Sequence, residues 1–74
     1  MREFTFRVDM DSASVKEIMY NSQIKRVQVL TEQGLRLDLP IGNFQRFVSY
    51  NGIHGRFLLT LDGSKFVSME KIES

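Results

Sequence analysis

The sequence predicts an α+β fold with a five-stranded, mainly antiparallel sheet, one helix and one shorter helical segment. Two observations predict it: several stretches alternate strictly between apolar and polar residues, and one stretch near the N-terminus has apolar residues at helical spacing. A chain of 74 residues is too short for two separate cores, so residues 1–74 are expected to form a single domain. The expected order is strand, helix, strand, strand, short helix, strand, strand.

The first strand is expected over residues 3–10, because its apolar residues alternate with charged or polar ones. The apolar positions are Phe4, Phe6, Val8 and Met10. A helix is expected over about 13–21. Residues 11–14 offer several N-cap candidates, and Ser14 with Glu17 three residues later forms a capping-box pattern. The paired carboxylates Asp9 and Asp11 are interpreted as part of this capping.

A hairpin is expected over residues 24–39. Residues 24–31 are β-branched and alternating, and Glu32-Gln33-Gly34 fits a three-residue loop whose last residue needs a left-handed conformation. This loop fixes the pairing of the two strands. The predicted partners are Thr31 with Leu35, Leu30 with Arg36, Val29 with Leu37, Gln28 with Asp38 and Val27 with Leu39.

Pro40 ends that strand, and Asn43 can cap a helical turn that carries Phe44, Phe47 and Val48. After a loop over 49–55, a second hairpin is expected from strands 56–61 and 65–72. A three-residue loop at 62–64 would pair Leu59 with Val67, Phe57 with Met69 and Arg56 with Glu70. Asp62-Gly63 as a two-residue turn would shift the pairing by one, and the side-chain pattern favours the longer loop.

The strands of the second hairpin have apolar residues on both faces, for example Leu58 opposed to Phe57, and Phe66 opposed to Val67. This pattern predicts a second buried face. The helix could cover it, the sheet could curl into a small barrel, or a second copy of the chain could bury it.

Composition excludes several classes of protein. The net charge of +1 is too small for polyanion binding through the overall field, so a nucleic-acid role would need a local patch. The chain has no cysteine, and no apolar run approaches the roughly 20 residues that span a bilayer. The N-terminus lacks the apolar block of a secretory signal, so a cytoplasmic protein without membrane insertion is expected.

The candidate binding residues cluster between positions 46 and 56, where the only histidine lies close to glycines, arginines and aromatics. They are Arg46, Tyr50, Asn51, His54 and Arg56. Gly52 and Gly55, with Asn51, are expected to supply positive φ angles in a turn. His54 is expected to cap backbone groups or pack in that loop, because no nucleophile or carboxylate stands beside it in a catalytic arrangement.

No catalytic residue, metal site or cofactor is predicted. One histidine and no cysteine cannot supply the four ligands of a structural zinc site, and the Asp9/Asp11 pair lacks the turn glycine and distal glutamate of a calcium loop. Phosphate-binding and nucleophile-elbow motifs are absent from the sequence. A small-molecule ligand is not expected either, since so short a chain has no room for an internal cleft.

The chain resembles a family of short, uncharacterised bacterial proteins classed as a domain of unknown function. The likeness rests on the aromatic first strand, Gly34, Pro40, the segment 46–48 (Arg-Phe-Val) and the segment 51–57 (Asn-Gly-Ile-His-Gly-Arg-Phe), and it covers nearly the whole chain. The segment Leu35-Arg36 is less basic than the family's usual pair. The resemblance implies a single-domain cytoplasmic protein and brings no activity.

The function that the sequence favours is a non-enzymatic binding or regulatory module. Its 46–56 surface, or an open sheet edge, would meet a protein partner or a second copy of the chain. The alternative is single-stranded nucleic-acid binding through the same basic and aromatic residues, with Lys25, Arg26 and Arg36 from the first hairpin. The spacing of Phe44, Phe47 and Phe57 favours the core over a stacking platform.

Overall fold

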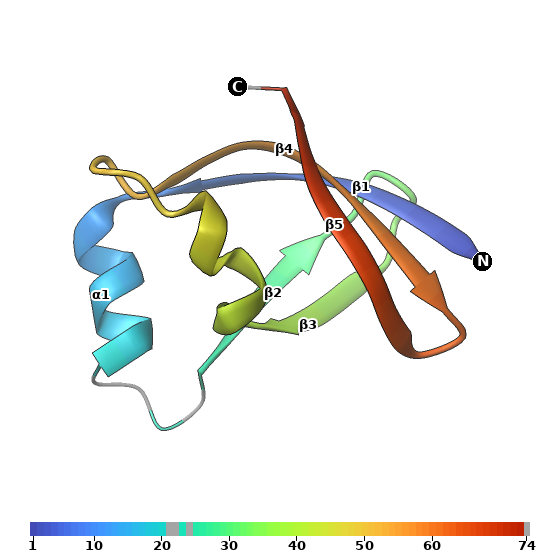
Figure 1. Ribbon diagram of the computed structural model, residues 1–74, viewed down its shortest axis with the longest axis horizontal. Coiled ribbons are helices and arrows are strands. Elements are labelled where there is room, and N and C mark those ends of the chain that lie inside the picture. Colours follow the sequence, from blue (N-terminus) through green and yellow to red (C-terminus); the bar gives the residue numbers. More distant parts are fainter. Residues whose placement is uncertain (21–22, 24, 74) are drawn as a thin grey trace.

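The five strands form two separate antiparallel sheets in the computed structural model, which describes residues 1–20, 23 and 25–73. Strands β1 (Arg2–Met10), β4 (Ile53–Asp62) and β5 (Lys65–Glu73) form a three-stranded sheet in the order β1-β4-β5. Strands β2 (Arg26–Leu30) and β3 (Arg36–Pro40) form a two-stranded sheet. The α-helix α1 (Ser12–Tyr20) follows β1, and the 3₁₀-helix η1 (Ile41–Phe47) follows β3 (Figure 1).

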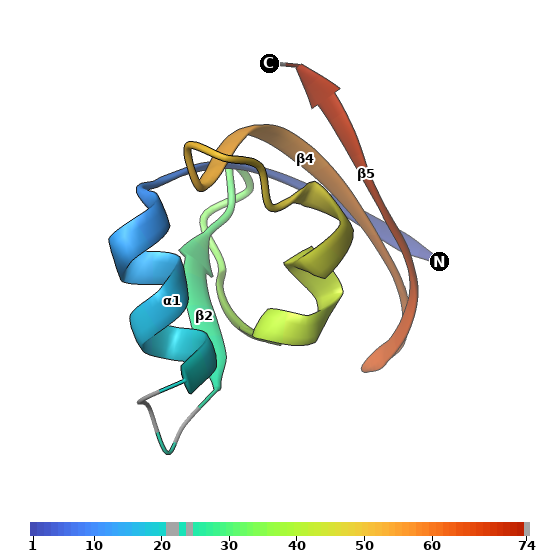
Figure 2. The ribbon, with the colours of Figure 1, turned by 60° about the vertical axis from the view of Figure 1, so that its left-hand side comes forward.

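The small α+β fold is confirmed, but the expectation of one five-stranded sheet is wrong, and the described strands do not close into a barrel. The reason lies at the free edge of β1. There the backbone N–H of Glu32 donates to the carbonyl of Thr5 at 2.7 Å, so the loop between β2 and β3 meets this edge and no strand continues the ladder. Figure 2 shows η1 enclosed between the curved β4–β5 hairpin and the side formed by α1 and β2.

The first strand and the first hairpin follow the sequence pattern closely. Phe4, Phe6 and Val8 are buried, and the partners of β2 and β3 are those predicted, from Val27 opposite Leu39 to Leu30 opposite Arg36. Gly34 has a φ of +86°, and Thr31 and Leu35 are joined by a backbone hydrogen bond of 2.8 Å. Turn chemistry and burial pattern therefore fix the register together. The expected start of this strand at Ile24 lies outside the described residues.

The register predicted for the second hairpin is wrong. Asp62 pairs with Lys65, so the loop has two residues, Gly63 and Ser64, and the partner of Leu59 is Met69. Register shifts lie between Thr60 and Leu61 and between Arg56 and Phe57. Such irregularities insert an extra residue into one strand, so neither the alternation of side chains nor the turn signal could locate the true partners.

The helical segments differ from expectation at their ends. The prediction that Asp11 caps α1 is confirmed, because its Oδ1 accepts the backbone N–H of Ser14 at 2.8 Å. The Ser14/Glu17 capping box is wrong, because α1 already begins at Ser12. The predicted helix end at Asn21 lies outside the described residues. The second helical segment is a 3₁₀-helix that starts directly after Pro40 without a side-chain cap, so the prediction that Asn43 caps it is wrong.

The core is a cluster of aromatic rings between the three-stranded sheet and η1. Phe6, Phe44 and Phe57 are fully buried, with ring centroids about 6 Å apart, and Phe47 packs edge-on against Phe57 at 5.0 Å. Edge-to-face packing of aromatic rings stabilises the folded state by more than the burial of their apolar surface alone. The prediction that Phe44, Phe47 and Phe57 serve the core is confirmed.

No helix in the described part of the chain is long and apolar enough to cross a membrane.

Neither the helix nor a closed barrel covers the second apolar face of β5, so these two alternatives are wrong, and burial by a second copy stays a prediction. Phe66, Val67 and Ile72 are each exposed by roughly two fifths of their surface within this single chain. The β5 strand lies at the edge of its sheet, and its other edge carries no strand among the described residues. The apolar side chains of this edge strand are therefore part of the exposed surface of the chain.

Candidate functional site

The side of the three-stranded sheet that faces away from the core, called here the outer face, carries a network of paired charges. Arg56 of β4 lies at its centre and holds two carboxylates. Its guanidinium donates to both carboxylate oxygens of Glu32, through contacts of 2.6 to 3.1 Å, and to Glu73 Oε2 at 2.7 Å. Arg7 approaches Glu73 at 3.7 Å. Arginine's planar fork suits such bidentate pairing.

These contacts shift the proton affinity of the groups involved. Hydrogen bonds from Arg56 and from Thr5 lower the pKa of Glu32 to about 2. The same bonds to Glu32 and Glu73 raise the pKa of Arg56. The predicted binding residue Arg56 therefore has its donors engaged within the chain, and it links the tip of the β2–β3 hairpin to the outer face.

His54 occupies one end of the outer face and is likewise held on both sides. Its Nδ1 meets Asp9 Oδ1, and its Nε2 lies 2.7 Å from the carbonyl oxygen of Asn51. These two contacts, the Asn51 carbonyl first, raise the pKa of His54, because both ring nitrogens can donate only in the protonated ring. The prediction that His54 caps backbone groups is confirmed, and Asp9 pairs with His54 instead of capping α1.

The turn that supplies Asn51 also exposes Tyr50. Ser49 and Gly52 exchange backbone hydrogen bonds of 2.7 and 3.0 Å, and Tyr50 between them is 96% exposed. Gly52 and Gly55 have the predicted positive φ, +106° and +143°, although Gly55 lies inside β4 and not in the turn, and Asn51 has a negative φ. Beside the turn lies a hollow of about 520 Å³ against α1. Its lining includes Lys16, Met19, Tyr20, Val48 and Tyr50.

Arg46 lies apart from the other predicted residues. Its guanidinium stacks on Phe47 at 4.9 Å and donates to the carbonyl of Met69 in β5 at 2.9 Å. The five predicted residues therefore occupy three places. Arg56 and His54, with the Asn51 carbonyl, belong to the outer face, Tyr50 lies at the tip of the turn, and Arg46 bridges η1 and β5.

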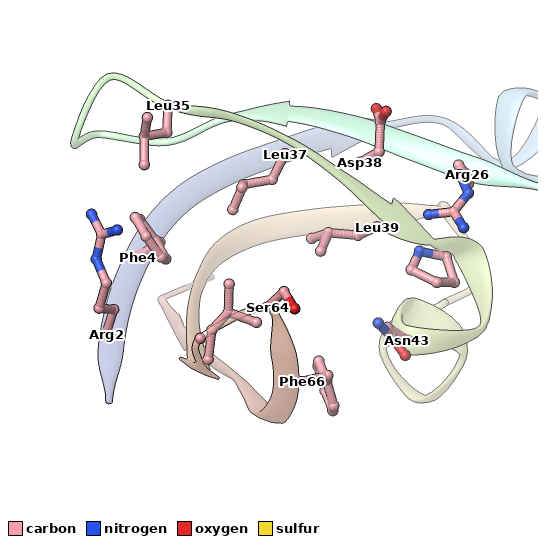
Figure 3. Close-up of a pocket in the computed structure, with 13 residues that line it drawn as sticks. Arg2, Phe4, Arg26, Leu35, Leu37, Asp38, Leu39, Asn43, Ser64 and Phe66 are labelled. Carbon is pink, nitrogen blue, oxygen red and sulfur yellow. The ribbon is translucent and has the colours of Figure 1, made fainter.

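Another hollow of the described structure was not predicted. It has a volume of about 610 Å³ and opens on the surface between the β2–β3 hairpin and the ends of β1, β4 and β5 (Figure 3). In Figure 3, Leu37 and Leu39 reach into it from β3, while Asp38 points away. We call it the arginine-rimmed hollow. Its apolar and arginine lining consists of Arg2, Phe4, Arg26, Leu35, Leu37, Leu39, Pro40, Leu61 and Phe66.

A second, narrower hollow of about 320 Å³ continues from it along β5. Asn43 and Phe66 line both. The second hollow has Gly42, Asn43 and Arg46 of η1 on one side and the consecutive residues 66–69 of β5 on the other. Side chains of consecutive strand residues point to opposite faces, so it is the backbone edge of β5 that lines this part. Because they share two lining residues, we treat the two hollows together and call them the groove.

The arginines around this groove have no carboxylate partner. Within the described residues no acidic group lies within 4.0 Å of the guanidinium of Arg2, Arg26 or Arg46, whereas on the outer face Arg7 has one such partner and Arg56 has two. Arg2 and Arg46 lie instead over the rings of Phe4 and Phe47. Stacking on an aromatic ring orients a guanidinium without neutralising its charge. The groove therefore combines exposed apolar surface with unpaired positive charge.

The arrangement offers little for metal or redox chemistry. The described part of the chain contains no group of three or more histidine, cysteine, aspartate or glutamate side chains that could hold a metal ion. The acidic groups nearest to His54 and Arg56 are already paired with them. What the surface can do chemically is bind an apolar group and an anionic group side by side.

Sequence reasoning missed Arg2, Phe4, Leu61 and Phe66 as site residues, and it named Arg26 only for the nucleic-acid alternative. They come from four strands, and only the fold brings them to one hollow. One signal was present: the alternation of residues 65–72 placed more apolar residues on β5 than one buried face requires. That excess marks the exposed edge that borders the groove.

Comparison with known proteins identifies a family but no activity. The search of curated proteins gives no match, and the search of solved structures gives none. A family model described as protein of unknown function (DUF2835) matches residues 2–72. The match spans all seven helices and strands almost completely, including both ends of the groove. The chain therefore belongs to the DUF2835 family of proteins of unknown function.

Proposed function

We propose that this protein is a non-enzymatic binding module that takes a protein partner in the arginine-rimmed hollow and along the neighbouring edge of β5. The observation that carries the proposal is the coincidence of exposed apolar side chains with arginines that have no acidic partner. Large exposed apolar surfaces bordered by charge are typical of protein interaction sites. The family resemblance adds the expectation of a bacterial, cytoplasmic protein.

Binding of a protein is favoured over binding of single-stranded nucleic acid. Nucleic-acid modules of this size stack bases on exposed aromatic side chains beside a basic track. Here Phe6, Phe44 and Phe57 are buried, and the described residues of the outer face include no phenylalanine, tyrosine or tryptophan, while the His54 ring is held by Asp9 and Asn51. The basic residues named for that alternative also lie on separate surfaces. Arg26 borders the hollow, whereas Arg56 belongs to the outer face.

A non-enzymatic role is supported by the state of the most reactive side chains. Both ring nitrogens of His54 are engaged within the chain. Nδ1 contacts Asp9, and Nε2 contacts the carbonyl oxygen of Asn51. General base catalysis needs a ring nitrogen that is free to take a proton from a substrate. The groove itself is lined by arginines and apolar residues, without a nucleophile and base in contact.

The test is a selection of linear peptides, displayed from a random library, on the immobilised full-length protein. Each enriched peptide is then titrated against two single variants, Phe66→Glu and Tyr50→Glu. Both place a carboxylate on an exposed aromatic position, but only Phe66 lines the hollow. We expect Phe66→Glu to weaken binding by about tenfold or more and Tyr50→Glu to leave it unchanged.

The reverse pattern would move the binding surface to the 48–51 turn and overturn the assignment to the hollow. A library that yields no peptide dependent on Phe66 would overturn the proposed function. A parallel titration of labelled single-stranded RNA and DNA at about 50 and 200 mM salt should show no binding. Tight binding that weakens steeply with salt would instead indicate nucleic acid as the ligand.

A further inference from the structure

We infer that the partner binds as an extended, acidic and apolar polypeptide segment that adds a strand to the free edge of β5. This inference rests on the proposed function and specifies its binding mode. It follows from a comparison of the two edges of the three-stranded sheet, from the walls of the groove, and from the charges around it.

The two edges of the sheet differ in how they are protected. At the edge of β1, Thr5 is satisfied on both sides: its carbonyl accepts the N–H of Glu32, and its N–H donates to Gln33 Oε1 at 3.0 Å. At the edge of β5, the described residues of other elements supply one hydrogen bond, which Arg46 donates to the carbonyl of Met69. Unpaired edge groups of this kind can hydrogen-bond to an added strand.

The open stretch is short and well defined. Residues 66–69 of β5 line the narrow hollow opposite η1, whereas the following residues Glu70, Lys71 and Glu73 are exposed and charged. Charged side chains on an edge strand discourage further pairing. An added strand would therefore pair with residues 66–69. Its side chains on one face would point toward the apolar lining of the arginine-rimmed hollow, which begins at Phe66.

The charges select the composition of the segment. Three guanidinium groups, those of Arg2, Arg26 and Arg46, border the groove without an acidic partner among the described residues. The acidic residue in the described lining, Asp38, points away from it (Figure 3). Carboxylates on the added segment would complement these groups. A carboxylate that pairs with Arg46 would draw its guanidinium from the Met69 carbonyl, which would then accept a backbone N–H from the segment.

A second copy of the chain complements this groove poorly. Its own β5 carries Lys65 and Lys71 as well as Glu70 and Glu73, so the edge as a whole offers no net negative charge to the arginines. Its groove would also bring three more unpaired arginines into the interface. A heterologous acidic segment meets neither problem.

The experiment uses the best peptide from the selection described above, together with backbone-methylated versions. In one version the amides of the odd positions carry N-methyl groups, and in the other those of the even positions. N-methylation removes a donor without changing the side chains. Only one set of amides can face β5 in an added strand, so we expect one version to lose about tenfold or more in affinity and the other to retain it.

Two protein variants test the charge. Arg46→Ala should weaken binding of the unmodified peptide by about tenfold, whereas Arg36→Ala should not, because Arg36 is an exposed arginine outside both hollows. The selected peptides should alternate acidic and apolar residues, and amide resonances of residues 66–69 should shift on binding. Melting temperatures of both variants establish that any loss of affinity does not come from unfolding.

The possible outcomes distinguish a failure of strand addition from a failure of the proposed binding function. A peptide that depends on Phe66 but tolerates N-methylation in both versions would keep the binding function and overturn strand addition. Basic peptides, or equal effects of the Arg46 and Arg36 variants, would overturn the acidic chemistry. Concentration-dependent dimerisation of the protein alone, with shifts at residues 66–69, would identify a second copy as the occupant. If the selection yields no peptide and decanoate alone shifts the amide resonances of residues 66–69, the ligand would be a small amphipathic anion and strand addition would be overturned.

Discussion

The outer face of the sheet and the groove use arginine in opposite ways. On the outer face, Arg56 is surrounded by Glu32 and Glu73, so its charge is neutralised within the fold. Around the groove, Arg2 and Arg46 lie on aromatic rings and meet no carboxylate in the described structure. A charge that the fold has already paired holds the molecule together, whereas an oriented but unpaired charge remains available to a partner. The contrast separates arginines that the fold neutralises from arginines whose charge stays available, which residue type alone does not do.

The largest effect is expected from Gly52→Ala, which tests how rigidly the backbone positions the His54 end of the outer face. A Cβ at Gly52 would lie 2.1 Å from the backbone oxygen of Met10, and its φ of +106° already disfavours other residues. We expect a loss of roughly 2 to 4 kcal/mol in the free energy of unfolding. Urea denaturation measures it.

Gly42→Ala is the matched control for this substitution. Gly42 has no atom within 4 Å of the added Cβ and no positive φ. Its replacement should leave the unfolding free energy nearly unchanged. Equal effects of the two substitutions would mean that the contact between the 49–52 turn and the end of β1 does not fix the outer face.

The next effect, in order of size, is expected from Arg56→Ala. Without its guanidinium, Glu32 and Glu73 lose their shared partner, and the tip of the β2–β3 hairpin loses its link to β4. The melting temperature should fall by several degrees, while the exposed arginine variant Arg36→Ala should melt as the wild type does. A wild-type melting temperature for Arg56→Ala would mean that the network contributes nothing, and the comparison between the two sides would fail.

The same network predicts a dependence on acid. The pKa of Glu32 is lowered in the folded chain to about 2 from an ordinary value near 4.5. A lowered carboxyl pKa contributes stability that is complete above the unfolded pKa and is lost as the pH falls toward the folded one. Stability should therefore decline between about pH 4.5 and pH 2, and part of that decline should be absent in Glu32→Gln. An identical acid profile in the variant would contradict the pairing with Arg56.

A smaller effect of opposite sign is expected from His54. Contacts with the Asn51 carbonyl and Asp9 raise its folded pKa, and Lys71 opposes them. A raised histidine pKa contributes stability that is complete below the unfolded pKa of about 6.5 and is lost as the pH rises through the folded value. Urea unfolding between pH 6 and pH 9 should show this decline for the wild type and a flatter profile for His54→Gln. The same slope in both proteins would assign it to another group.

Part of this organisation could be predicted from the sequence, and part could not. The register of the β2–β3 hairpin was predictable because the loop with Gly34 and the alternation of Val27 and Val29 require the same pairing. The β4–β5 register was not, since its bulges add residues that no local pattern marks. The division into two sheets also escaped prediction, because alternation indicates which face of a strand is buried but not which strand lies beside it.

The candidate site divides in the same manner. The residues Arg46, Tyr50, Asn51, His54 and Arg56 are close in sequence, and proximity in sequence suggested one surface. The alternation of β4 keeps His54 and Arg56 on one face, whereas Tyr50 lies in the turn at Ser49–Gly52 and Arg46 lies in η1. The pairing of Arg56 with Glu32, 24 residues away, depends on how the hairpin tip meets the sheet. Sequence alone could identify arginines, but only the fold decides which of them are neutralised.

The smallest effect on stability is expected where the groove's arginines are removed. Arg2→Ala and Arg26→Ala should each change the unfolding free energy by no more than about 0.5 kcal/mol, because neither guanidinium has a carboxylate partner among the described residues. Urea denaturation at neutral pH, with Arg56→Ala as the reference, measures the difference. A loss as large as that of Arg56→Ala would make these arginines structural and remove the charge argument for an acidic partner. If stability is unchanged, the charges of Arg2 and Arg26 do not contribute to folding. Their position beside exposed apolar side chains then supports the proposed binding role.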